Sequence, residues 1–164
     1  ELLDMHDPET QLVAQLTYDF NEFLMQLVVQ NRFPDSLQPI PLTLAYHIPC
    51  QYRGHRIGKP GMELMSLIPG LNAIDTRTSC CGIAGTYGYK QEKYDIAMQV
   101  GNELFEFIDE VDGPLVICDS ETCRWQITHA TGVPAVHPVE ILAVAMGLEI
   151  EEPLAGVITE IGKG

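Results

Sequence analysis

Basic residues are scarce in this sequence, and it has no long apolar run. Among 164 residues, 9 Lys and Arg stand against 23 Asp and Glu, which gives a formal net charge of −14. Such a surface repels phosphate groups, so nucleic acid and anionic lipid are poor partners for this chain. Apolar runs are short or interrupted, as Leu24 to Val29 is by Gln26, whereas a bilayer span needs about 20 apolar residues. We therefore expect a globular domain, with 46% hydrophobic residues, rather than a membrane protein or a disordered acidic tail.

The sequence holds five cysteines, an odd number that leaves one thiol over from any set of disulfides. No signal peptide is recognisable, so nothing indicates an oxidising compartment. We therefore expect reduced thiols that bind a metal or react, rather than a disulfide framework. The chain begins at Glu1 instead of a methionine, and we expect it to be a piece of a longer protein.

The N-terminal segment is expected to form one amphipathic helix over residues 7–31. Asp7 can cap this helix, and Pro8 suits its first position because the missing N–H needs no partner there. Apolar residues recur at helical spacing and are interpreted as a core-facing stripe: Leu12, Leu16, Phe20, Phe23, Leu24, Leu27 and Val28.

Further along, strand-like and helix-like segments alternate. Expected strands cover 42–47, 71–75, 115–118 and 133–136, and expected helices cover 60–67, 90–111, 121–130 and 138–146. This alternation is typical of an α/β fold with a small, mostly parallel sheet flanked by helices.

Three regions follow from this reading. We assign residues 1–41 to an N-terminal helix and linker, 42–147 to a single domain, and 148–164 to an acidic, Gly-rich tail without assigned structure.

The cysteines are expected at one edge of the sheet. Each ends a predicted strand or follows one, and open α/β sheets collect ligands and reactive groups at the carboxyl ends of their strands. Successive side chains diverge, so Cys80 and Cys81 can share a metal only in a sharply bent loop, which Gly82 and Gly85 permit. A single tetrahedral zinc could use one of this pair, whereas a multi-iron cluster could use both. The five positions are Cys50, Cys80, Cys81, Cys118 and Cys123.

Three strings carry a resemblance to the CCG (cysteine-rich) domain family: YHIPC at 46–50, CCGIAGTYGYK at 80–90 and ETCRWQI at 121–127. In that family an upstream Cys, a CCG triplet and a downstream CxxC follow one another. Within it, residues 7–147 are similar to the second CCG domain of the C subunits of anaerobic glycerol-3-phosphate dehydrogenases. The B subunit of heterodisulfide reductase and the E subunit of some succinate dehydrogenases share the domain.

The resemblance implies an iron–sulfur cluster, a 4Fe–4S centre that is noncubane and held by five cysteines in the best-understood members. Soft thiolates suit such a cluster. In place of the first Cys of the CxxC the sequence has Ser120, and Cys118 lies two residues earlier, so either could supply the fifth ligand. The alternative for Cys118 is a plain buried residue of the strand. With four thiolates or fewer, a cubane 4Fe–4S cluster, a 2Fe–2S centre, zinc or no metal are alternatives. The matching cysteines are Cys50, Cys80, Cys81 and Cys123.

For function, the resemblance implies an electron-transfer domain. Electrons would pass from flavin-containing dehydrogenase subunits through this subunit to membrane quinone. The subunit's ferredoxin-like domain and first CCG domain would lie upstream. The chain would be cytoplasmic, peripheral on the inner face of the cytoplasmic membrane. We assign no catalytic residue and leave open whether the chain is an enzyme. The alternatives are a thiol–disulfide reductase, as in the heterodisulfide reductase relatives, and a zinc-bound or metal-free structural domain.

Other polar and aromatic residues lie near the cysteines. His47 ends a predicted strand and His137 directly follows one. Both are interpreted as hydrogen-bonded structural residues, with a ligand or proton-donor role as the alternative. Trp125 is interpreted as a packing residue beneath the site. A basic cluster in the loop after Cys50 is interpreted as solvated surface, and the alternative is that it offsets cluster charge or docks an anionic partner or quinol. It comprises Arg53, His55, Arg56 and Lys59.

Overall fold

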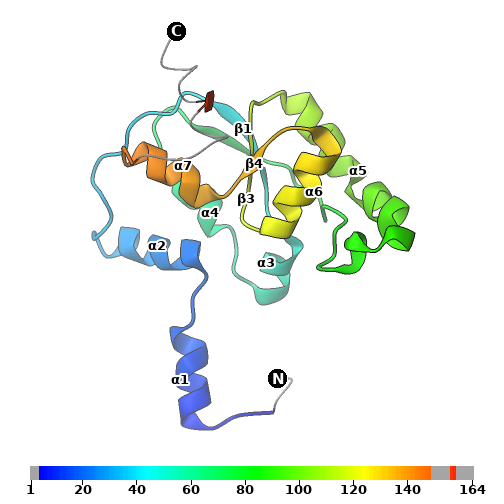
Figure 1. Ribbon diagram of the computed structural model, residues 1–164. Helices are drawn as coiled ribbons and strands as arrows, with labels where there is room; N and C mark the ends of the chain where they lie inside the picture. Colours follow the sequence, from blue (N-terminus) through cyan, green and yellow to red (C-terminus); the bar gives the residue numbers. More distant parts are fainter. Residues whose placement is uncertain (1–3, 149–155, 158–164) are drawn as a thin grey trace.

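Four short parallel strands form the centre of the domain (Figure 1). They lie in the order β2-β1-β3-β4, and every neighbouring pair runs parallel. The expected α/β fold with a parallel sheet is thereby confirmed. The strands are β1 (Thr43–His47), β2 (Asn72–Asp75), β3 (Val116–Cys118) and β4 (Ala135–Val136).

The structure, a computed structural model, describes residues 4–148 and 156–157. The predicted tail at 148–164 therefore lies outside the described residues, apart from positions 148, 156 and 157. Within the described part the α-helices are α1 (Pro8–Leu16), α2 (Phe20–Val29), α3 (Cys50–His55), α4 (Pro60–Met65), α5 (Tyr94–Val111), α6 (Glu121–Thr131) and α7 (Pro138–Ala145).

Helices cover both faces of the sheet. Alternate strand residues point to opposite faces, so Tyr46 and Ile117 pack in one buried cluster with residues of α4 and α7. Ala45 and Val116 pack in a second cluster with residues of α5 and α6. This three-layer arrangement leaves the carboxyl ends of the strands as the edge where loops can form a site.

The N-terminal segment forms two helices, so the single helix predicted over 7–31 is wrong. The Asp19 carboxylate accepts the N–H of Asn21, and the Glu22 carboxylate accepts the N–H of Asp19. This capping box begins a new helix, α2, and its N-cap residue Asp19 has an extended backbone that interrupts the helix before it. In Figure 1, α1 extends away from the sheet, and none of its residues is buried.

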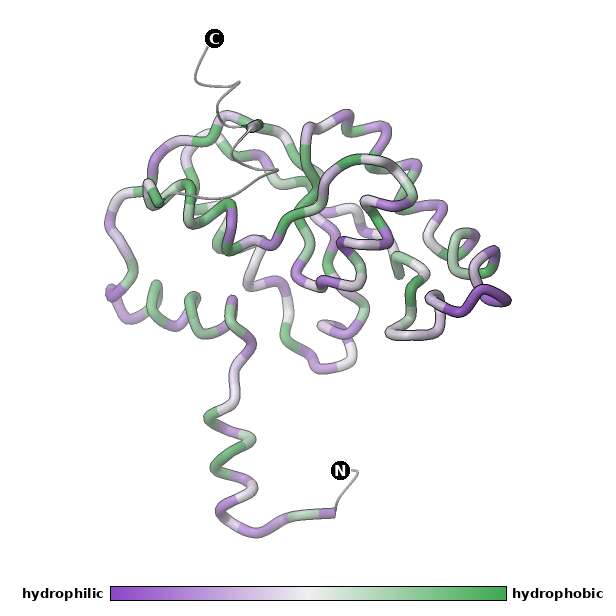
Figure 2. Tube along the Cα trace, viewed as in Figure 1, coloured by the Kyte–Doolittle hydropathy of each residue, from purple (hydrophilic) through white to green (hydrophobic). Residues whose placement is uncertain are grey.

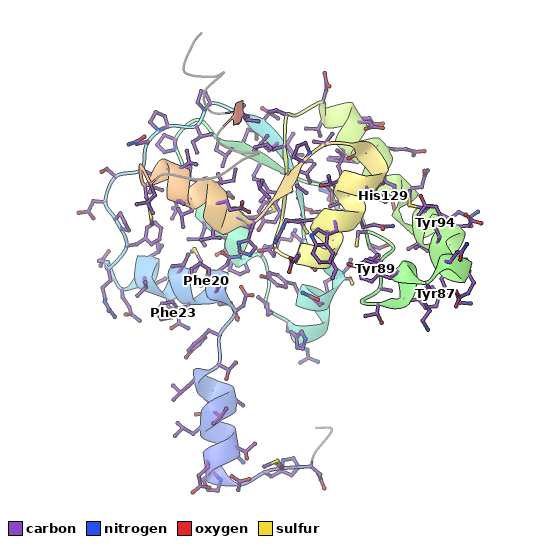
Figure 3. All side chains as sticks on the ribbon, in the orientation of Figure 1. Phe20, Phe23, Tyr87, Tyr89, Tyr94 and His129 are labelled. Carbon is purple, nitrogen blue, oxygen red and sulfur yellow. The ribbon has the colours of Figure 1, made fainter. Side chains whose placement is uncertain are left out.

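The predicted core-facing stripe is accordingly wrong over its first half. Phe20 and Phe23 are exposed and point outward from α2 (Figure 3). Leu12 and Leu16 are exposed on α1, and Figure 2 shows apolar colour along this helix. The second half behaves as expected, because partly buried residues of α2 pack against the core next to α4. Those residues include Leu24, Met25 and Val28.

Two local features were not predicted. A short helix, α3, begins at Cys50, where we expected a loop. Two 3-10 turns, Tyr87–Tyr89 and Gln91–Lys93, precede α5, so this helix begins at Tyr94 instead of residue 90. The other predicted boundaries agree within about two residues, the usual uncertainty of helix and strand ends. Among the described residues, no helix combines the length and apolar character that crossing a bilayer requires.

Candidate metal centre

The structure brings the five cysteines to the carboxyl edge of the sheet. β1 and β3 end side by side there, with His47 opposite Cys118 in the strand register. Helix α3 follows β1 and begins with Cys50. The loop after β2, here called the CCG loop, carries Cys80, Cys81 and Gly82, and α6, with Cys123, follows β3. All of the thiols are free: Cys50, Cys80, Cys81, Cys118 and Cys123.

Two of the thiols are in direct contact. The Cys81 thiol donates to the sulfur of Cys123 at an Sγ–Sγ distance of 2.9 Å, and both side chains are buried. Hydrogen bonds from the thiols of Cys118 and Cys81 hold the pKa of Cys123 below its usual range, more than offsetting its burial. The same contact with Cys123 raises the pKa of Cys81, and burial acts in the same direction. The contact thus favours the thiolate form of Cys123, the form that binds a metal.

Cys50 and Cys80 form the outer part of the site. Cys50 is exposed at the start of α3, and Cys80 is half-buried. Burial, followed by the neighbouring Cys80, raises the pKa of Cys50. The sulfur of Cys80 accepts the backbone N–H of Gly82 at 3.3 Å. The site thus has a buried part around Cys123 and an outer part that solvent reaches.

Glycine allows the CCG loop to lie directly on α5. Gly82 has φ of +89°, and a Cβ atom there would overlap the carbonyl oxygen of Ala97 in α5. A Cβ atom on Gly101 would lie 2.6 Å from the carbonyl oxygen of Cys81. Only glycine fits this close approach of two backbones. The contact fixes the position from which Cys81 reaches Cys123.

His47 offers a nitrogen atom to the same group. Its side chain is fully buried, and its Nδ1 lies 3.4 Å from the hydroxyls of both Thr76 and Thr78. Its Nε2 is buried and has no hydrogen-bond partner among the described residues. One ligand atom each from His47, Cys81 and Cys123 lie within 4.8 Å of one another. An unpartnered buried nitrogen beside two sulfurs fits a metal site, because buried polar atoms are normally paired.

Both candidates for the fifth ligand lie close to Cys123. Cys118 is fully buried at the end of β3, and its sulfur lies 3.8 Å from the carbonyl oxygen of Ser120. Ser120 is buried at the N-cap of α6, but its hydroxyl faces that of Thr122 at 3.3 Å and makes no capping bond. The hydroxyl of Ser120 also lowers the pKa of Cys123, which places it beside that sulfur.

An acidic residue between these two candidates organises the surrounding structure. Asp119 accepts hydrogen bonds from the amide of Asn21 at 2.7 Å, from the hydroxyl of Tyr46 at 2.9 and 3.1 Å, and from the hydroxyl of Tyr52 at 3.3 Å. Burial raises its pKa despite these donors. Asp119 thereby ties α2, β1 and α3 to the loop that carries the ligands. No sequence spacing pointed to this residue, although it follows a predicted strand directly.

The structure agrees with the interpretation of His137 and contradicts that of Trp125. His137 accepts the N–H of Val139 at 3.1 Å and caps α7, which agrees with a structural role. The interpretation of Trp125 as a packing residue is wrong, because its side chain is 56% exposed. It faces the ring of Tyr89 with a centroid distance of 6.3 Å.

A parallel sheet with thiols and an imidazole at its carboxyl edge defines a class of protein, the cysteine-rich α/β domain whose soft donors suit a transition metal or an iron–sulfur cluster. The sequence profile of the CCG cysteine-rich domain matches residues 44–128. The chain belongs to this family, as the three sequence strings predicted.

Three proteins are similar in sequence to parts of this chain. The chain is 42% identical over 110 residues to the C subunit of the anaerobic glycerol-3-phosphate dehydrogenase of Escherichia coli (strain K12), covering 67% of this chain and 28% of that protein. It is 33% identical over 91 residues to an uncharacterised iron–sulfur protein of Methanocaldococcus jannaschii, covering 55% of this chain and 18% of the relative. It is 26% identical over 130 residues to the B subunit of the fumarate reductase (CoM/CoB) of Methanothermobacter marburgensis, covering 77% of this chain and 25% of that protein. The matched part of the chain thus spans between 18% and 28% of the length of these relatives.

Proposed function

We propose that this chain is an iron–sulfur electron-transfer domain, with the cluster held by the thiols of Cys50, Cys80, Cys81 and Cys123. The contact between Cys81 and Cys123 at 2.9 Å carries the proposal. It joins the loop after β2 to the first turn of α6, and both thiols are free. The name of one relative, an iron–sulfur protein, supports the same chemistry.

The residues present fit such a cluster. Sulfur ligands are the soft donors that iron–sulfur clusters use, and the lowered pKa of Cys123 favours its thiolate form. When bound, the cluster would supply one-electron transfer. The chain would tune its potential through hydrogen bonds to the ligand sulfurs, of which the Gly82 N–H to Cys80 is one. Cys118 or Ser120 would complete a set of five for a noncubane 4Fe–4S cluster.

The wider role follows from the relative with 42% identity, a subunit of an anaerobic glycerol-3-phosphate dehydrogenase. On this proposal the domain takes electrons from flavin-containing subunits and passes them towards membrane quinone, at the inner face of the cytoplasmic membrane. The ferredoxin-like domain and first CCG domain of the same subunit would be its neighbours. Reduction of quinone analogues by the full-length subunit tests this role. Reduction of disulfides instead would indicate the thiol–disulfide reductase alternative.

The cluster itself is tested by purifying the protein without oxygen, reconstituting it with iron and sulfide, and measuring iron, sulfide and zinc. We expect iron and sulfide in equal amounts, about four of each per chain, with an electron paramagnetic resonance signal on reduction or oxidation. Cys81→Ser and Cys123→Ser should each lose most of the iron. Ser66→Ala, at an exposed serine of the α4 end, is the control and should keep it. One zinc per chain without iron would contradict the proposal.

A zinc site is a second candidate because His47, Cys81 and Cys123 alone offer three close ligand atoms. Three protein ligands with a fourth position open, or a fourth supplied by a nearby thiol, are usual for zinc. His47→Leu separates the two. A zinc site would lose its metal in this variant, whereas a cluster held by thiols would keep its iron with a shifted reduction potential.

A further inference from the structure

The two ring nitrogens of His47 have different neighbours. The side chain is fully buried at the end of β1, and its Nδ1 lies 3.4 Å from the hydroxyl oxygens of both Thr76 and Thr78. Its Nε2 has no hydrogen-bond partner among the described residues. One ligand atom of His47 lies within 4.8 Å of the sulfurs of Cys81 and Cys123. Hydroxyl groups therefore occupy Nδ1, and Nε2 is the nitrogen left for the thiol site.

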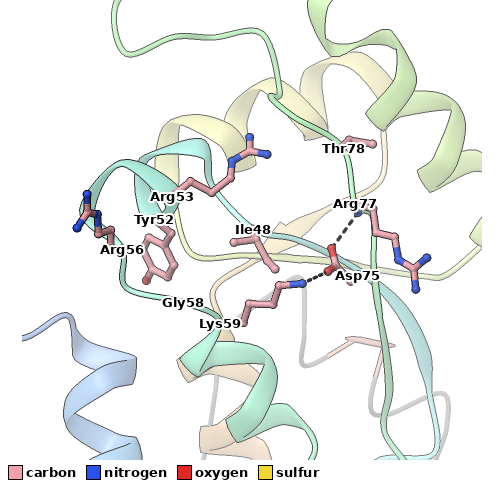
Figure 4. Close-up of a pocket in the computed structure, with 9 residues that line it drawn as sticks. All are labelled: Ile48, Tyr52, Arg53, Arg56, Gly58, Lys59, Asp75, Arg77 and Thr78. Carbon is pink, nitrogen blue, oxygen red and sulfur yellow. Dashed lines mark hydrogen bonds and ion pairs between the residues drawn. The ribbon is translucent and has the colours of Figure 1, made fainter.

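A turn after β2 holds the two threonines together. The carboxylate of Asp75, the last residue of β2, accepts the backbone N–H of Arg77 at 2.8 Å, and Thr78 follows on the same loop (Figure 4). Arg77 has a left-handed backbone with φ of 57°, which bends the chain between Thr76 and Thr78. Both side chains are buried, and their hydroxyl oxygens lie 3.1 Å apart. The turn thus sets both hydroxyls beside the same ring nitrogen.

The hydroxyl protons indicate which nitrogen carries the proton of the neutral ring. Each threonine has one proton to donate, and within the described part of the chain each hydroxyl has only the other hydroxyl and Nδ1 of His47 as partners. If Nδ1 is bare, one hydroxyl donates to the other and the second donates to Nδ1, so both protons have acceptors. If Nδ1 is protonated, it donates to a hydroxyl, and one hydroxyl proton is left without an acceptor. Buried donors are normally paired, so the bare Nδ1 is favoured.

A neutral imidazole with a bare Nδ1 carries its proton on Nε2. In that form Nε2 is a hydrogen-bond donor and not a metal ligand, because metal binding uses the lone pair of an unprotonated nitrogen. The sulfur of Cys123 is the nearby acceptor. His47 acts to lower the pKa of Cys123, the effect of a donor close to a thiolate. A negatively charged sulfur would thus supply the partner that the buried Nε2 lacks.

We propose that His47 is a positioning residue that acts through Cys123: its Nε2–H donates a hydrogen bond to the Cys123 sulfur, and the two threonine hydroxyls hold the proton on that nitrogen. A donor to a ligand sulfur stabilises the negative charge that a cluster gains on reduction, so His47 raises the reduction potential. The position of the proton does not depend on a cluster, whereas the effect on the potential rests on the proposed function.

The proton is located by nuclear magnetic resonance of the metal-free, ¹⁵N-labelled protein at about pH 8, above the range in which histidine usually titrates. Long-range ¹H–¹⁵N spectra distinguish a bare ring nitrogen from a protonated one. We expect a bare Nδ1 and a protonated Nε2 for His47, whose signals are identified by their loss in His47→Gln. Dispersed amide signals check that the protein is folded. A proton on Nδ1 would overturn the proposal.

The effect on the potential is measured by redox titration of the iron-loaded protein, followed by electron paramagnetic resonance. A matched pair of variants isolates the donor, because the amide nitrogen of glutamine reaches the position of Nε2 whereas that of asparagine reaches only that of Nδ1. His47→Asn should lower the potential by about 59 mV, a tenfold fall in the ratio of reduced to oxidised cluster for a one-electron couple. His47→Gln should change that ratio by less than about twofold. Iron content should be equal in all three proteins.

Two results of the titration would overturn the proposal. Loss of iron in both His47 variants would make His47 a ligand, and equal potentials of the two variants would show that a donor at the Nε2 position does not act on the cluster. A protein that takes up no iron under any condition would contradict the proposed function instead. The magnetic resonance experiment would then still decide where the proton of His47 lies.

Discussion

The sulfur of Cys81 lies 2.9 Å from the sulfur of Cys123, although 42 residues separate them in the chain. Two packing features hold these two sulfur atoms close together. The CCG loop lies on the backbone of α5, and Cys123 lies in the first turn of α6. A helix N-terminus favours negative charge, so the thiolate of Cys123 is in a favourable position. The site is therefore formed by the helices that cover the sheet as much as by the strand ends.

The first prediction concerns the loop support. Gly82→Ala places a methyl group against the Ala97 carbonyl at a backbone φ of +89°, so we expect a loss of about 3 kcal/mol in the free energy of unfolding. Gly85→Ala also has positive φ, +65°, but meets nothing within 4 Å, and should cost about 1 kcal/mol. Urea unfolding measures both.

Iron retention of the same pair links this support to the site. Gly82→Ala should also release iron faster to a chelator than the unsubstituted protein, because the Cys81 sulfur moves with the loop. Gly85→Ala should release it at the unsubstituted rate. Equal behaviour of the two variants would show that contact with α5 does not position Cys81.

The second prediction concerns the fifth ligand. The thiol of Cys118 acts to lower the pKa of Cys123 and so lies close to that sulfur, and we expect Cys118→Ala to lower the affinity for the cluster by about tenfold or more. Adding Ser120→Cys to that variant should restore it, because position 120 is also beside Cys123. Chelator competition measures the affinity. Ile117→Val, in the same strand but in the opposite core cluster, is the control and should leave it unchanged. Unchanged affinity in Cys118→Ala would make Cys118 a plain core residue.

Much of the site could be predicted because parallel strands end at a common edge. Cys118 ends a strand and Cys80 follows one, so the sequence alone indicated where their side chains would lie. The role of His47 could not be predicted in the same way. The strand register sets His47 opposite Cys118, its Nδ1 faces Thr76 and Thr78, and its Nε2 is left without a partner among the described residues. That arrangement depends on three separate segments.

The N-terminal error has a different physical cause. Apolar spacing continues from Leu16 to Phe20 and indicates one helix, but the capping box of Asp19 and Glu22 favours a new start between them. The capping-box residues can be seen in the sequence, but the continuous spacing of apolar residues indicated a single helix across them. The Asn21 contact with Asp119 spans 98 positions, a separation at which no local pattern gives information.

The third prediction concerns that contact. Asp119→Asn removes the charged acceptor shared by Asn21, Tyr46 and Tyr52, and we expect a loss of about 2 kcal/mol in the free energy of unfolding. Iron retention should fall as well, because Asp119 lies between Cys118 and Ser120. Asp109→Asn, at an exposed position of α5, makes the same chemical change and should be neutral. A neutral Asp119→Asn would show that packing alone holds α2 and α3 in place.

The last prediction concerns pH. Burial, with the nearby Arg124, lowers the pKa of His137 below its ordinary value of 6.5. The unfolded chain therefore binds a proton at His137 more readily than the folded chain, and stability from this residue is lost as pH falls from about 7 through the lowered pKa. His137→Asn keeps an N-cap acceptor for α7 but cannot titrate, so its unfolding free energy should fall less between pH 7 and 5, roughly the window in which histidine titrates. His55→Asn, at an exposed ring, should keep the unsubstituted profile. Urea unfolding at a series of pH values measures all three proteins, and parallel curves for the unsubstituted protein and His137→Asn would contradict the prediction.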